Sequence, residues 1–533
     1  MTTAHTLDLT GASLIGNADL DGSGAAFQAT DPATGASLDP VYHNATAADV
    51  DRAAALAWDA FKTYRHTTMD RRAAFLESVA DEIDALGSTL TERVHAETGI
   101  PLARVQGETA RTTGQLRMFA DVVRDGGWTH ARLDTADAER APLPKPDLRQ
   151  REVPLGPVAV FAASNFPLAF SVAGGDTASA LAAGAPVIVK AHSAHPGTSE
   201  LVGRAVRKAV QAHGLPEGTF SLIFGSGREV GIALVTDPRI RAVGFTGSRQ
   251  GGLALVAAAN ARDTPIPVYA EMSSINPVFV LAGALAEHAT ELGTAYIASV
   301  NTGVGQLCTS PGLVFLVDGP GADDFVAAAA EAVTSSRAAP MLSPGLAAAF
   351  SGGVGRLVEN PSVTVAARGV DDSSVACKGV PGLFVTTAEE FLSDPDIQDE
   401  VFGPASVIVR VADVDQLGPI LDSLEGQLTA TIHAAPTDDA AAAALLERLE
   451  LLAGRVLFNG WPTGVEVGHA VIHGGPFPAT SAPSTTSVGA RAIERFLRPV
   501  AYQNVPEQLL PPELRTDNPL GISRRIDGTV QQP

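Results

Sequence analysis

The amino-acid sequence predicts an α/β protein built around a doubly wound parallel sheet, and two observations carry this prediction. Between Pro157 and Met272, short apolar runs alternate strictly with helical patterns, as they do when a helix connects each pair of parallel strands. The chain also has 533 residues, well beyond the roughly 250–300 at which a single core stops growing. We therefore expect the sheet to form one of at least two domains.

Each predicted strand in this stretch is an apolar run short enough to be a buried strand, and a helical pattern follows it. Sheets of this kind bind ligands at the carboxyl ends of their strands, so the residues that follow each run are candidate binding residues. The expected strands are 158–162, 186–190, 220–224, 242–245 and 267–271, and the expected helices are 167–181, 197–212, 229–236 and one that begins near 249.

Helical patterns also precede this stretch, and a second alternating region follows it. Residues 136–150 and 476–504 are rich in proline and in charged or hydroxyl side chains, which favours a connection or an extended arm. Helical patterning is expected over 46–98, 103–124, 323–336 and 437–451, and the second region has expected strands at 277–281 and 312–317.

The composition excludes several classes of protein. Lys and Arg total 37 against 59 Asp and Glu, a formal charge of −22, which argues against nucleic acid or an anionic membrane as a partner. Two cysteines cannot build a disulfide framework. Residues 1–22 lack a basic and then apolar leader, and no apolar run approaches the roughly 20 residues of a membrane helix. We expect a cytoplasmic protein.

Cys308 lies in NTGVGQLCTSPG, where glycines and small residues surround a thiol. Glycines permit tight turns and close approach of a ligand, and a thiolate is a strong nucleophile. The alternative is a buried structural cysteine, which is a common fate of a free thiol. Both interpretations stay open on this loop alone. Cys377, in SSVACKGV, has no such setting and is expected to be inert.

Two further residues lie where a doubly wound sheet places functional groups. Glu271 ends the run PVYAE, where a carboxylate with a raised pKa acts as a general base toward water; a solvated strand-end carboxylate is the alternative. Asn165, in AASNFPLAF, has an amide suited to stabilising a developing oxyanion, and a helix cap explains it equally well.

Several residues after the predicted strands suit a nucleotide. Lys190 ends one strand and Ser193 lies just beyond it, where both are placed to contact a ribose. Gly247 and Ser248, in FTGS, open a helix whose backbone N–H groups suit a pyrophosphate. The segment GSGREVG is not a dinucleotide fingerprint, because its last spacing is one residue too long. No metal site is expected.

Together these segments resemble the aldehyde dehydrogenase superfamily over about residues 25–505. Six motifs stand in family order: GPVAVFAASNFPLAF, PVIVKAHSAHPGTSE, FTGSRQGG, AEMSSINP, GQLCTS and EVFGPASVIV. Where the family usually has Glu-Leu-Gly-Gly, this chain has Glu-Met-Ser-Ser from Glu271. That departure, together with FNGWPTGVEVGHAVIHGGPFPATS and RFLRPVAYQNVP, resembles the branch of α-ketoglutaric semialdehyde (2,5-dioxopentanoate) dehydrogenases. An NADP-linked fatty aldehyde branch shares part of the pattern.

The resemblance implies a role for each matching residue. Cys308 would attack an aldehyde to form a thiohemiacetal, the Asn165 amide and the Cys308 N–H would hold the oxyanion, and Glu271 would activate the water that hydrolyses the thioester. Lys190 and Glu400 would hold the two riboses of NADP or NAD, Phe402 would flank the nicotinamide, and Gly247 and Ser248 would lie by the pyrophosphate.

Cofactor choice and one histidine extend this expectation. NAD-selective relatives commonly carry a glutamate three residues after the lysine, where this chain has the neutral Ser193. Arg228 is available to pair with a 2′-phosphate, which favours NADP. His469 lies on a loop that overhangs the cysteine in this family, where it would tune the thiolate or relay a proton. A surface histidine is the alternative.

We therefore expect an aldehyde dehydrogenase-like fold with a cofactor domain, a catalytic domain and a β oligomerisation arm. The function expected is NAD(P)-dependent oxidation of α-ketoglutaric semialdehyde to 2-oxoglutarate, with a fatty aldehyde dehydrogenase and a silent nucleotide-binding scaffold as alternatives. The arm indicates a homodimer or homotetramer. The expected boundaries are 1–135 with 156–274 for the NAD(P)-binding domain, 275–475 for the catalytic domain, 136–155 with 476–510 for the arm, and 511–533 for a tail that wraps the surface.

Overall fold

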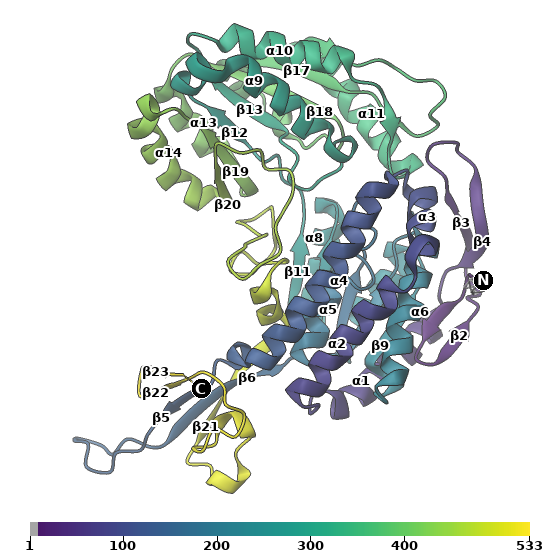
Figure 1. Ribbon diagram of the computed structural model, residues 1–533, viewed down its shortest axis with the longest axis vertical. Coiled ribbons are helices and arrows are strands. Elements are labelled where there is room, and N and C mark those ends of the chain that lie inside the picture. The colour runs from purple at the N-terminus through teal and green to yellow at the C-terminus, as the bar shows by residue number, and fades with distance from the viewer. Residues whose placement is uncertain (1–8, 533) are drawn as a thin grey trace.

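The computed structural model describes residues 9–532, and Figure 1 shows two α/β bodies with a β arm that projects from the lower one. Residues 1–8 and Pro533 lie outside the described residues. Residues 1–22, in which we expect no secretory signal, are therefore only partly described. The first residues of the expected NAD(P)-binding domain and the last residue of the expected tail also lie outside the described residues. Within the described chain, no helix is both long and apolar enough to span a bilayer.

The lower body contains the predicted doubly wound sheet. Its seven strands run in the order β11-β10-β7-β8-β9-β1-β2, and the first five are parallel to one another. The order reverses between β7 and β10, which creates the crevice where such sheets bind ligands. The parallel strands are β7 (Val158–Phe161), β8 (Val187–Lys190), β9 (Phe220–Ile223), β10 (Ala242–Thr246) and β11 (Val268–Glu271).

Two N-terminal strands extend this sheet beyond what the alternating pattern predicts. β1 (Ser13–Ile15) pairs antiparallel with β9, and β2 (Ala18–Leu20) pairs antiparallel with β1. The side chains of β1 are fully buried, so the strand completes the core at this edge. A separate hairpin, β3 (Ala26–Thr30) and β4 (Ser37–His43), lies beside α3 and α6 in Figure 1.

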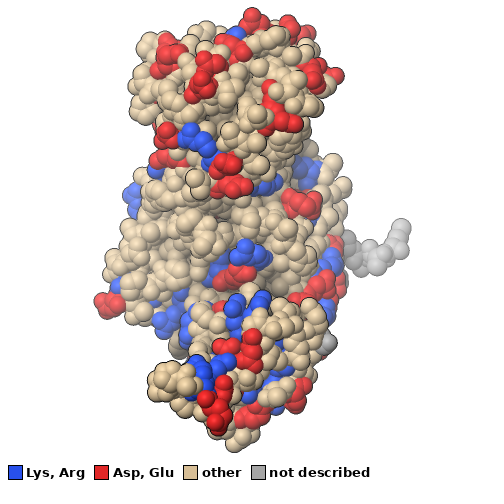
Figure 2. All heavy atoms as spheres, turned by 90° about the vertical axis from the view of Figure 1, so that its left-hand side faces the viewer, with Lys and Arg blue, Asp and Glu red and all other residues tan. Residues whose placement is uncertain are grey.

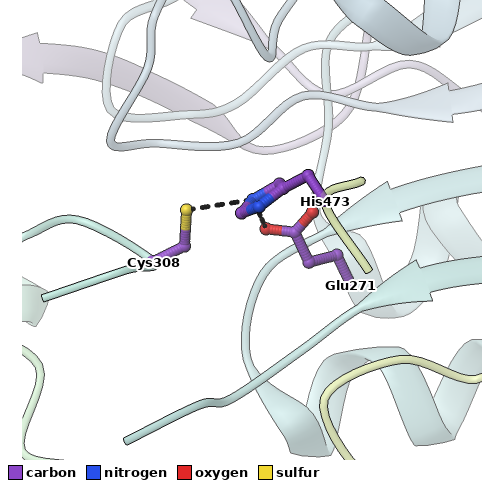
Figure 3. A group of neighbouring side chains, drawn as sticks. All are labelled: Glu271, Cys308 and His473. Carbon is purple, nitrogen blue, oxygen red and sulfur yellow. Dashed lines mark hydrogen bonds and ion pairs between the residues drawn. The ribbon is translucent and has the colours of Figure 1, made fainter. Parts of the chain in front are cut away.

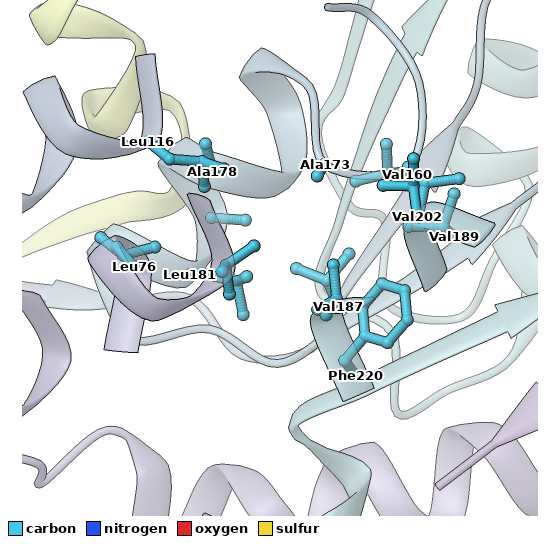
Figure 4. Packing of buried hydrophobic residues seen from close by; sticks show 14 of the residues in the cluster. Leu76, Leu116, Val160, Ala173, Ala178, Leu181, Val187, Val189, Val202 and Phe220 are labelled. Atoms are coloured by element: carbon cyan, nitrogen blue, oxygen red, sulfur yellow. The ribbon is translucent and has the colours of Figure 1, made fainter. Parts of the chain in front are cut away.

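Helices cover both faces of the sheet. The cluster in Figure 4 includes Leu76 and Leu116 from the N-terminal helices, Leu181 from the helix that follows β7, and Val187 and Phe220 from the sheet, and all five are buried. Burial of such side chains contributes about 1.5–3 kcal/mol each. The helices are α1 (Ala47–Tyr64), α2 (Met69–Asp84), α3 (Gly87–Thr98), α4 (Leu102–Asp125), α5 (Gly175–Ala183), α6 (Pro196–Ala212), α7 (Ile232–Thr236) and α8 (Arg249–Asn260).

The helix predicted over 167–181 begins later than expected, at Gly175. Residues before it form turns, because the N–H groups of Leu168 and Ala169 donate to the buried carboxylate of Glu108, at 2.8 and 3.0 Å. A carboxylate from α4 thus takes the backbone donors that an earlier helix would have used. Local sequence patterns do not reveal a partner about 60 residues away.

The upper body contains a second seven-stranded sheet, which confirms the second α/β region. Its order is β15-β17-β18-β13-β12-β19-β20, parallel except where β15 meets β17. Its strands are β12 (Val278–Val280), β13 (Leu313–Val317), β15 (Thr364–Arg368), β17 (Gly382–Thr387), β18 (Ala405–Val411), β19 (Gln427–His433) and β20 (Ala453–Phe458). Its helices are α9 (Ala282–Asn301), α10 (Ala322–Ser335), α11 (Pro344–Glu359), α12 (Ala388–Ser393), α13 (Leu417–Ser423) and α14 (Asp439–Leu452), with a short pair β14 (Ala339–Pro340) and β16 (Lys378–Gly379) at one side.

The arm differs in composition from the expected 136–155 and 476–510. It is a five-stranded sheet in the order β21-β6-β5-β22-β23. The last two strands come from the tail, which therefore joins the arm and does not wrap the surface. Residues 490–496 instead pack into the core of the lower body, through Ile493 and Phe496. The strands are β5 (Arg132–Asp134), β6 (Leu148–Pro154), β21 (Leu497–Gln503), β22 (Arg524–Ile526) and β23 (Thr529–Gln531).

Candidate functional site

The candidate active site lies where the carboxyl end of β11 meets the loop between α9 and β13. Glu271 is the last residue of β11, and Cys308 lies on that loop. His473 reaches the same point from the long irregular segment after β20. Figure 3 shows the imidazole between the thiol and the carboxylate. Three separate stretches of the chain thus converge on one point.

The imidazole of His473 contacts both partners through the same nitrogen. Nε2 lies 2.9 Å from Glu271 Oε1 and 3.3 Å from Cys308 Sγ. The three ligand-type atoms lie within 4.8 Å of one another, close enough for proton transfer or for one divalent ion. The Ser487 hydroxyl donates to the other oxygen of Glu271 at 2.7 Å. The carboxylate is therefore hydrogen-bonded at both oxygens and held in one orientation.

Charge and burial set the protonation of this cluster. Burial raises the pKa of Cys308 well above its ordinary value, and the Glu271 carboxylate raises it further. Burial also favours a neutral Glu271, but the His473 ring and the hydroxyl of Ser487 outweigh it and hold the pKa of Glu271 below its ordinary value. At neutral pH the cluster therefore holds a protonated thiol beside an ionised carboxylate.

The loop that carries Cys308 is fixed by close packing and by one amide. Gly303 and Gly305 have φ of +63° and +66°, and a Cβ on Gly305 would lie 2.1 Å from the backbone of Gly403, so glycine is required there. The Asn276 amide donates to the carbonyls of Cys308 and Ser310, both at 2.9 Å. These contacts hold the thiol at a fixed position relative to β11.

Asn165 lies beside this loop. Its side chain is buried, and Nδ2 donates to the carbonyl of Gln306 at 3.1 Å. An amide nitrogen carries two N–H groups, so one remains for another acceptor near the thiol. Asn165 is not the cap of α5, which begins ten residues later with Gly174 as its cap.

The structure brings His473, and not His469, to the thiol. His469 is exposed and lines a surface cavity with Trp128, His130 and Arg491. It does not contact the thiol in the described structure, whereas His473 does. Both histidines lie on the same irregular segment, four positions apart, and no periodic pattern there indicates which one points inward.

The residues expected to hold the cofactor lie on the two sides of the crevice. Lys190 ends β8 and is buried, and Glu400 and Phe402 line a cavity with Ser274 and Gly305. Burial lowers the pKa of Lys190 to about 8 and raises that of Glu400 to about 8. Among the described residues, no ion pair neutralises either group. Two such groups fit the hydroxyls of a bound ligand.

The remaining expected cofactor residues follow neighbouring strands. Gly247 and Ser248 come after β10, and the Ser248 hydroxyl accepts from Gly251 N–H at 3.2 Å as the cap of α8. The first N–H groups of this helix therefore point into the crevice. Ser193 follows β8 and Arg228 follows β9, both exposed, and these two strands are adjacent in the sheet.

Three residues of the site escaped the sequence analysis: His473, Asn276 and Ser487. Asn276 stands in the motif AEMSSINP, and its φ of +50°, a value that asparagine tolerates better than most residues, is invisible in sequence. The segment IHGG contains His473. Its two glycines after a histidine gave a weak signal for a tightly packed turn.

Comparisons with known proteins agree with this geometry. Residues 20–360 match the model of the aldehyde dehydrogenase family. The chain is 56% identical to alpha-ketoglutaric semialdehyde dehydrogenase 2 of Azospirillum brasilense, over 98% of this chain and 100% of the relative. It is 49% identical to alpha-ketoglutaric semialdehyde dehydrogenase of Acinetobacter baylyi, over 92% and 93%.

Solved structures share the fold. A putative aldehyde dehydrogenase from Burkholderia cenocepacia superposes with a TM-score of 0.77 at 22% identity, over 93% of this chain and 100% of that one. A structure of 3,6-anhydro-L-galactose dehydrogenase in complex with NAP gives the same TM-score and identity, over 92% and 99%. This chain is an oxidoreductase that acts on an aldehyde, and it belongs to the aldehyde dehydrogenase family, whose members use NAD or NADP.

Proposed function

We propose that the protein oxidises α-ketoglutaric semialdehyde to 2-oxoglutarate, with NAD(P) as hydride acceptor and water as the source of the second oxygen. The observation that carries the proposal is the contact of Cys308 with His473 and Glu271 at the edge of the crevice. A nucleophile, a hydrogen-bond donor and a base in mutual contact are the groups needed for oxidation through a thioester. The two relatives named for this substrate support the choice of aldehyde.

In the first step Cys308 Sγ bonds to the aldehyde carbon and its proton passes to Glu271. The developing oxyanion accepts hydrogen bonds from the free N–H of Asn165 and from the backbone N–H of Cys308. The donor Asn165 is already fixed by its bond to Gln306. A preorganised donor of this kind contributes about 3–4 kcal/mol to an acyl-transfer transition state.

His473 assists by donating from Nε2. Its N–H is shared between Glu271 Oε1 and Sγ, so it stabilises the sulfur as the thiol proton leaves. The raised pKa of Cys308 explains why such a donor is needed. A hydrogen bond to a charged group is worth about 1.5–3 kcal/mol, enough to raise the thiolate population by one or two orders of magnitude.

The state of Lys190 and Glu400 supports binding of a dinucleotide in the crevice. Both side chains are desolvated, and no ion pair within the described chain neutralises them. Lys190 and Glu400 would hold the two riboses, Phe402 would flank the nicotinamide, and Gly247 and Ser248 would face the pyrophosphate. When bound, NAD(P) supplies the hydride acceptor. Once Glu271 has released the thiol proton to solvent, it takes a proton from the water that attacks the thioester.

We also propose that NADP is accepted and preferred. Ser193 is neutral and Arg228 is exposed, and they follow adjacent strands at the edge where the adenosine ribose would lie. A guanidinium recognises a phosphate with paired N–H groups. Replacement of Arg228 by Ala should raise the KM for NADP by about tenfold and leave that for NAD unchanged. An unchanged KM for NADP would contradict the assignment.

The arm supports assembly into a homodimer or homotetramer. It projects away from the lower body in Figure 1, and β21 and β23 form its two edges. Open strand edges are normally covered by a partner. We propose a reducing cytoplasmic compartment as well, because the function requires a free thiol at Cys308. Sedimentation of the purified chain measures the assembly state, and a monomer at micromolar concentration would contradict it.

Side-by-side assays test the proposed reaction. The purified protein is mixed with NADP and each of three aldehydes, and absorbance of the reduced nicotinamide is followed. We expect kcat/KM for α-ketoglutaric semialdehyde to exceed those for succinic semialdehyde and hexanal at least tenfold. Faster oxidation of hexanal would favour a fatty aldehyde dehydrogenase. Absence of signal with all three would indicate a silent scaffold. A signal that appears only after CoA is added would indicate a CoA-acylating enzyme.

A further inference from the structure

We propose that Arg111 and Arg455 form a binding site for the distal carboxylate of the substrate, so that the enzyme selects aldehydes that carry an acid group at the far end. This inference rests on the proposed function and names the residues that make its substrate choice. Arg111 lies on α4 of the lower body and Arg455 on β20 of the upper body. The proposed site is therefore assembled from both bodies.

One short loop brings the two guanidinium groups together. Arg111 Nη1 donates to the carbonyl of Val465, and Arg455 donates to the carbonyls of Gly464, at 2.9 Å, and Pro462, at 2.7 Å. The acceptors span only residues 462–465. Both side chains are therefore fixed by peptide groups that are neighbours in the chain.

Both arginines retain donors that no group in the described part of the chain satisfies. Within the described chain, the Nε atoms of Arg111 and Arg455 are buried and have no hydrogen-bond partner. No ion pair engages either side chain there. A buried N–H on a charged group without an acceptor is costly, and an oxyanion ligand removes that cost. A carboxylate is the smallest ligand that satisfies a guanidinium with two oxygens.

The arginines lie within electrostatic range of the nucleophile. Arg111 Cζ lies 6.0 Å from the centre of the Phe170 ring, and that ring lies 6.1 Å from the ring of His473, which touches the thiol. Burial lowers the pKa of both guanidiniums, and a negative charge on Cys308 counteracts this at each of them. Arg111, Phe170 and His473 are therefore successive neighbours in a series that ends at the thiol.

The surroundings leave positive charge for a ligand. Glu108 and Glu466 are the carboxylates whose charge acts on Arg111, but Glu108 already accepts two backbone N–H groups and Glu466 is exposed. The walls next to the arginines are apolar: Phe166, Phe170, Val465, Val467 and Val488 form one cluster. Two cations beside an apolar cluster fit a short carbon chain with an aldehyde at one end and a carboxylate at the other.

The expected ligand carries its carboxylate a short distance from its aldehyde. In α-ketoglutaric semialdehyde four C–C bonds of about 1.5 Å separate the aldehyde carbon from the carboxylate carbon, roughly 5 Å when extended. An uncharged aldehyde of equal length would leave both guanidiniums unsatisfied. Sites that bury a polar group reject ligands that cannot pair with it far more strongly than apolar sites reject an extra methylene.

Substitution of each arginine by glutamine tests the proposal. Glutamine keeps an N–H donor for the loop carbonyl and removes the charge. In R111Q and R455Q we expect kcat/KM for the semialdehyde to fall about 10- to 100-fold, the loss expected for a hydrogen bond to a charged group. For pentanal, which has five carbons and no acid group, kcat/KM should stay within about threefold. R117Q is the matched control, since Arg117 lies on the same helix and pairs with Asp81 and Asp84 at the surface.

An equal loss for both aldehydes, or no loss for either, would overturn the proposal. A second measurement needs no variant and no turnover. Glutarate, a dicarboxylate with five carbons, should protect Cys308 of the wild-type protein from iodoacetamide, and butyrate at the same concentration should protect it at least tenfold less. Equal protection by the two acids, or no protection, would also overturn it.

The two measurements separate this inference from the proposed function. If the wild-type protein oxidises hexanal faster than the semialdehyde, the proposed function fails. Glutarate protection that disappears in R111Q and R455Q would still support the arginine site in that case. Conversely, the preference for the semialdehyde could be unchanged in both R111Q and R455Q. That result would support the proposed function and show that these arginines do not cause the preference.

Discussion

The two sides of the crevice differ in how their polar groups are satisfied. On the thiol side, Cys308, His473 and Glu271 lie in contact, and the Ser487 hydroxyl donates a hydrogen bond to the second oxygen of Glu271. On the cofactor side, Lys190 and Glu400 are desolvated, and no ion pair in the described chain neutralises them. The protein therefore fixes its reacting groups before any ligand arrives and leaves its cofactor groups to be completed by the ligand.

This difference has a physical reason. Reacting atoms must be aligned to fractions of an ångström, so their orientation is set by rigid contacts within the protein. A cofactor that binds and leaves in each cycle needs protein groups that are free to pair with it. If those groups were already paired within the protein, their hydrogen bonds or ion pairs would have to break before the cofactor could bind. Changes on the thiol side should therefore alter rate with little effect on cofactor affinity, and changes on the cofactor side should alter affinity and stability.

The largest expected effect comes from Cys308→Ala. Loss of the nucleophile should lower kcat by at least about 10⁴-fold, as removal of an attacking group does in other covalent enzymes. Binding of NADP should remain within about twofold, since no cofactor group is changed. Steady-state assays and fluorescence titration of NADPH measure the two quantities. A loss of cofactor binding would show that the two sides of the crevice are not independent.

Glu271→Gln should separate reactivity of the thiol from turnover. The amide cannot accept a proton, so kcat should fall about 10²- to 10⁴-fold. The carboxylate raises the pKa of Cys308, so its removal should lower that pKa and increase the thiolate fraction at pH 7. We expect alkylation of Cys308 by iodoacetamide at pH 7 to become faster while turnover becomes slower. The rate as a function of pH should rise through a midpoint above the ordinary thiol range in the wild-type protein and through a lower one in the variant. An unchanged midpoint would contradict the charge coupling.

The sequence predicted most of the fold because the alternation of strand and helix is a local property. It did not predict that the tail would supply β22 and β23 to the arm, because those strands are three residues long. β22, which joins them to the arm, pairs with β5 almost 400 positions away in the chain. The late start of α5 has the same origin, since the Glu108 carboxylate is a distant partner.

At the site, motifs indicated Cys308, Glu271 and Asn165, and the structure brings them together. The histidine could not be chosen from sequence, because His469 and His473 share an irregular segment in which spacing does not define direction. The distribution of surface charge could not be predicted from the sequence either. In Figure 2 acidic and basic side chains are interspersed on the face in view. A net charge of −22 indicates nothing about where the basic residues gather. The two arginines near the thiol are likewise invisible until the chain is folded.

His473→Gln should have a smaller effect than the loss of either Cys308 or Glu271. Without the ring N–H the thiolate loses one donor, and kcat should fall about 10- to 100-fold. The midpoint of Cys308 alkylation should move to higher pH, opposite in direction to the change expected for Glu271→Gln. His469→Gln is the matched control, because that side chain is exposed in a separate cavity and should leave both measurements unchanged. An equal effect of the two substitutions would contradict the assignment of the hydrogen-bond donor to His473 alone.

The smallest expected effect concerns Glu400 and the pH dependence of stability. Burial raises its pKa to about 8 from the ordinary 4.5. Between these values the folded chain holds a proton that the unfolded chain has released, so stability from this group falls as pH rises through that window. Glu400→Gln removes the titration. The variant should therefore match the wild-type Tm at pH 4.5 and exceed it by a few °C at pH 8, about 1–3 kcal/mol after allowance for partial exposure. Bound NADP should reduce that gap, because the cofactor satisfies the carboxyl only in the wild-type protein. A Tm difference independent of pH would show that Glu400 is already paired, and that the contrast between the two sides of the crevice does not extend to it.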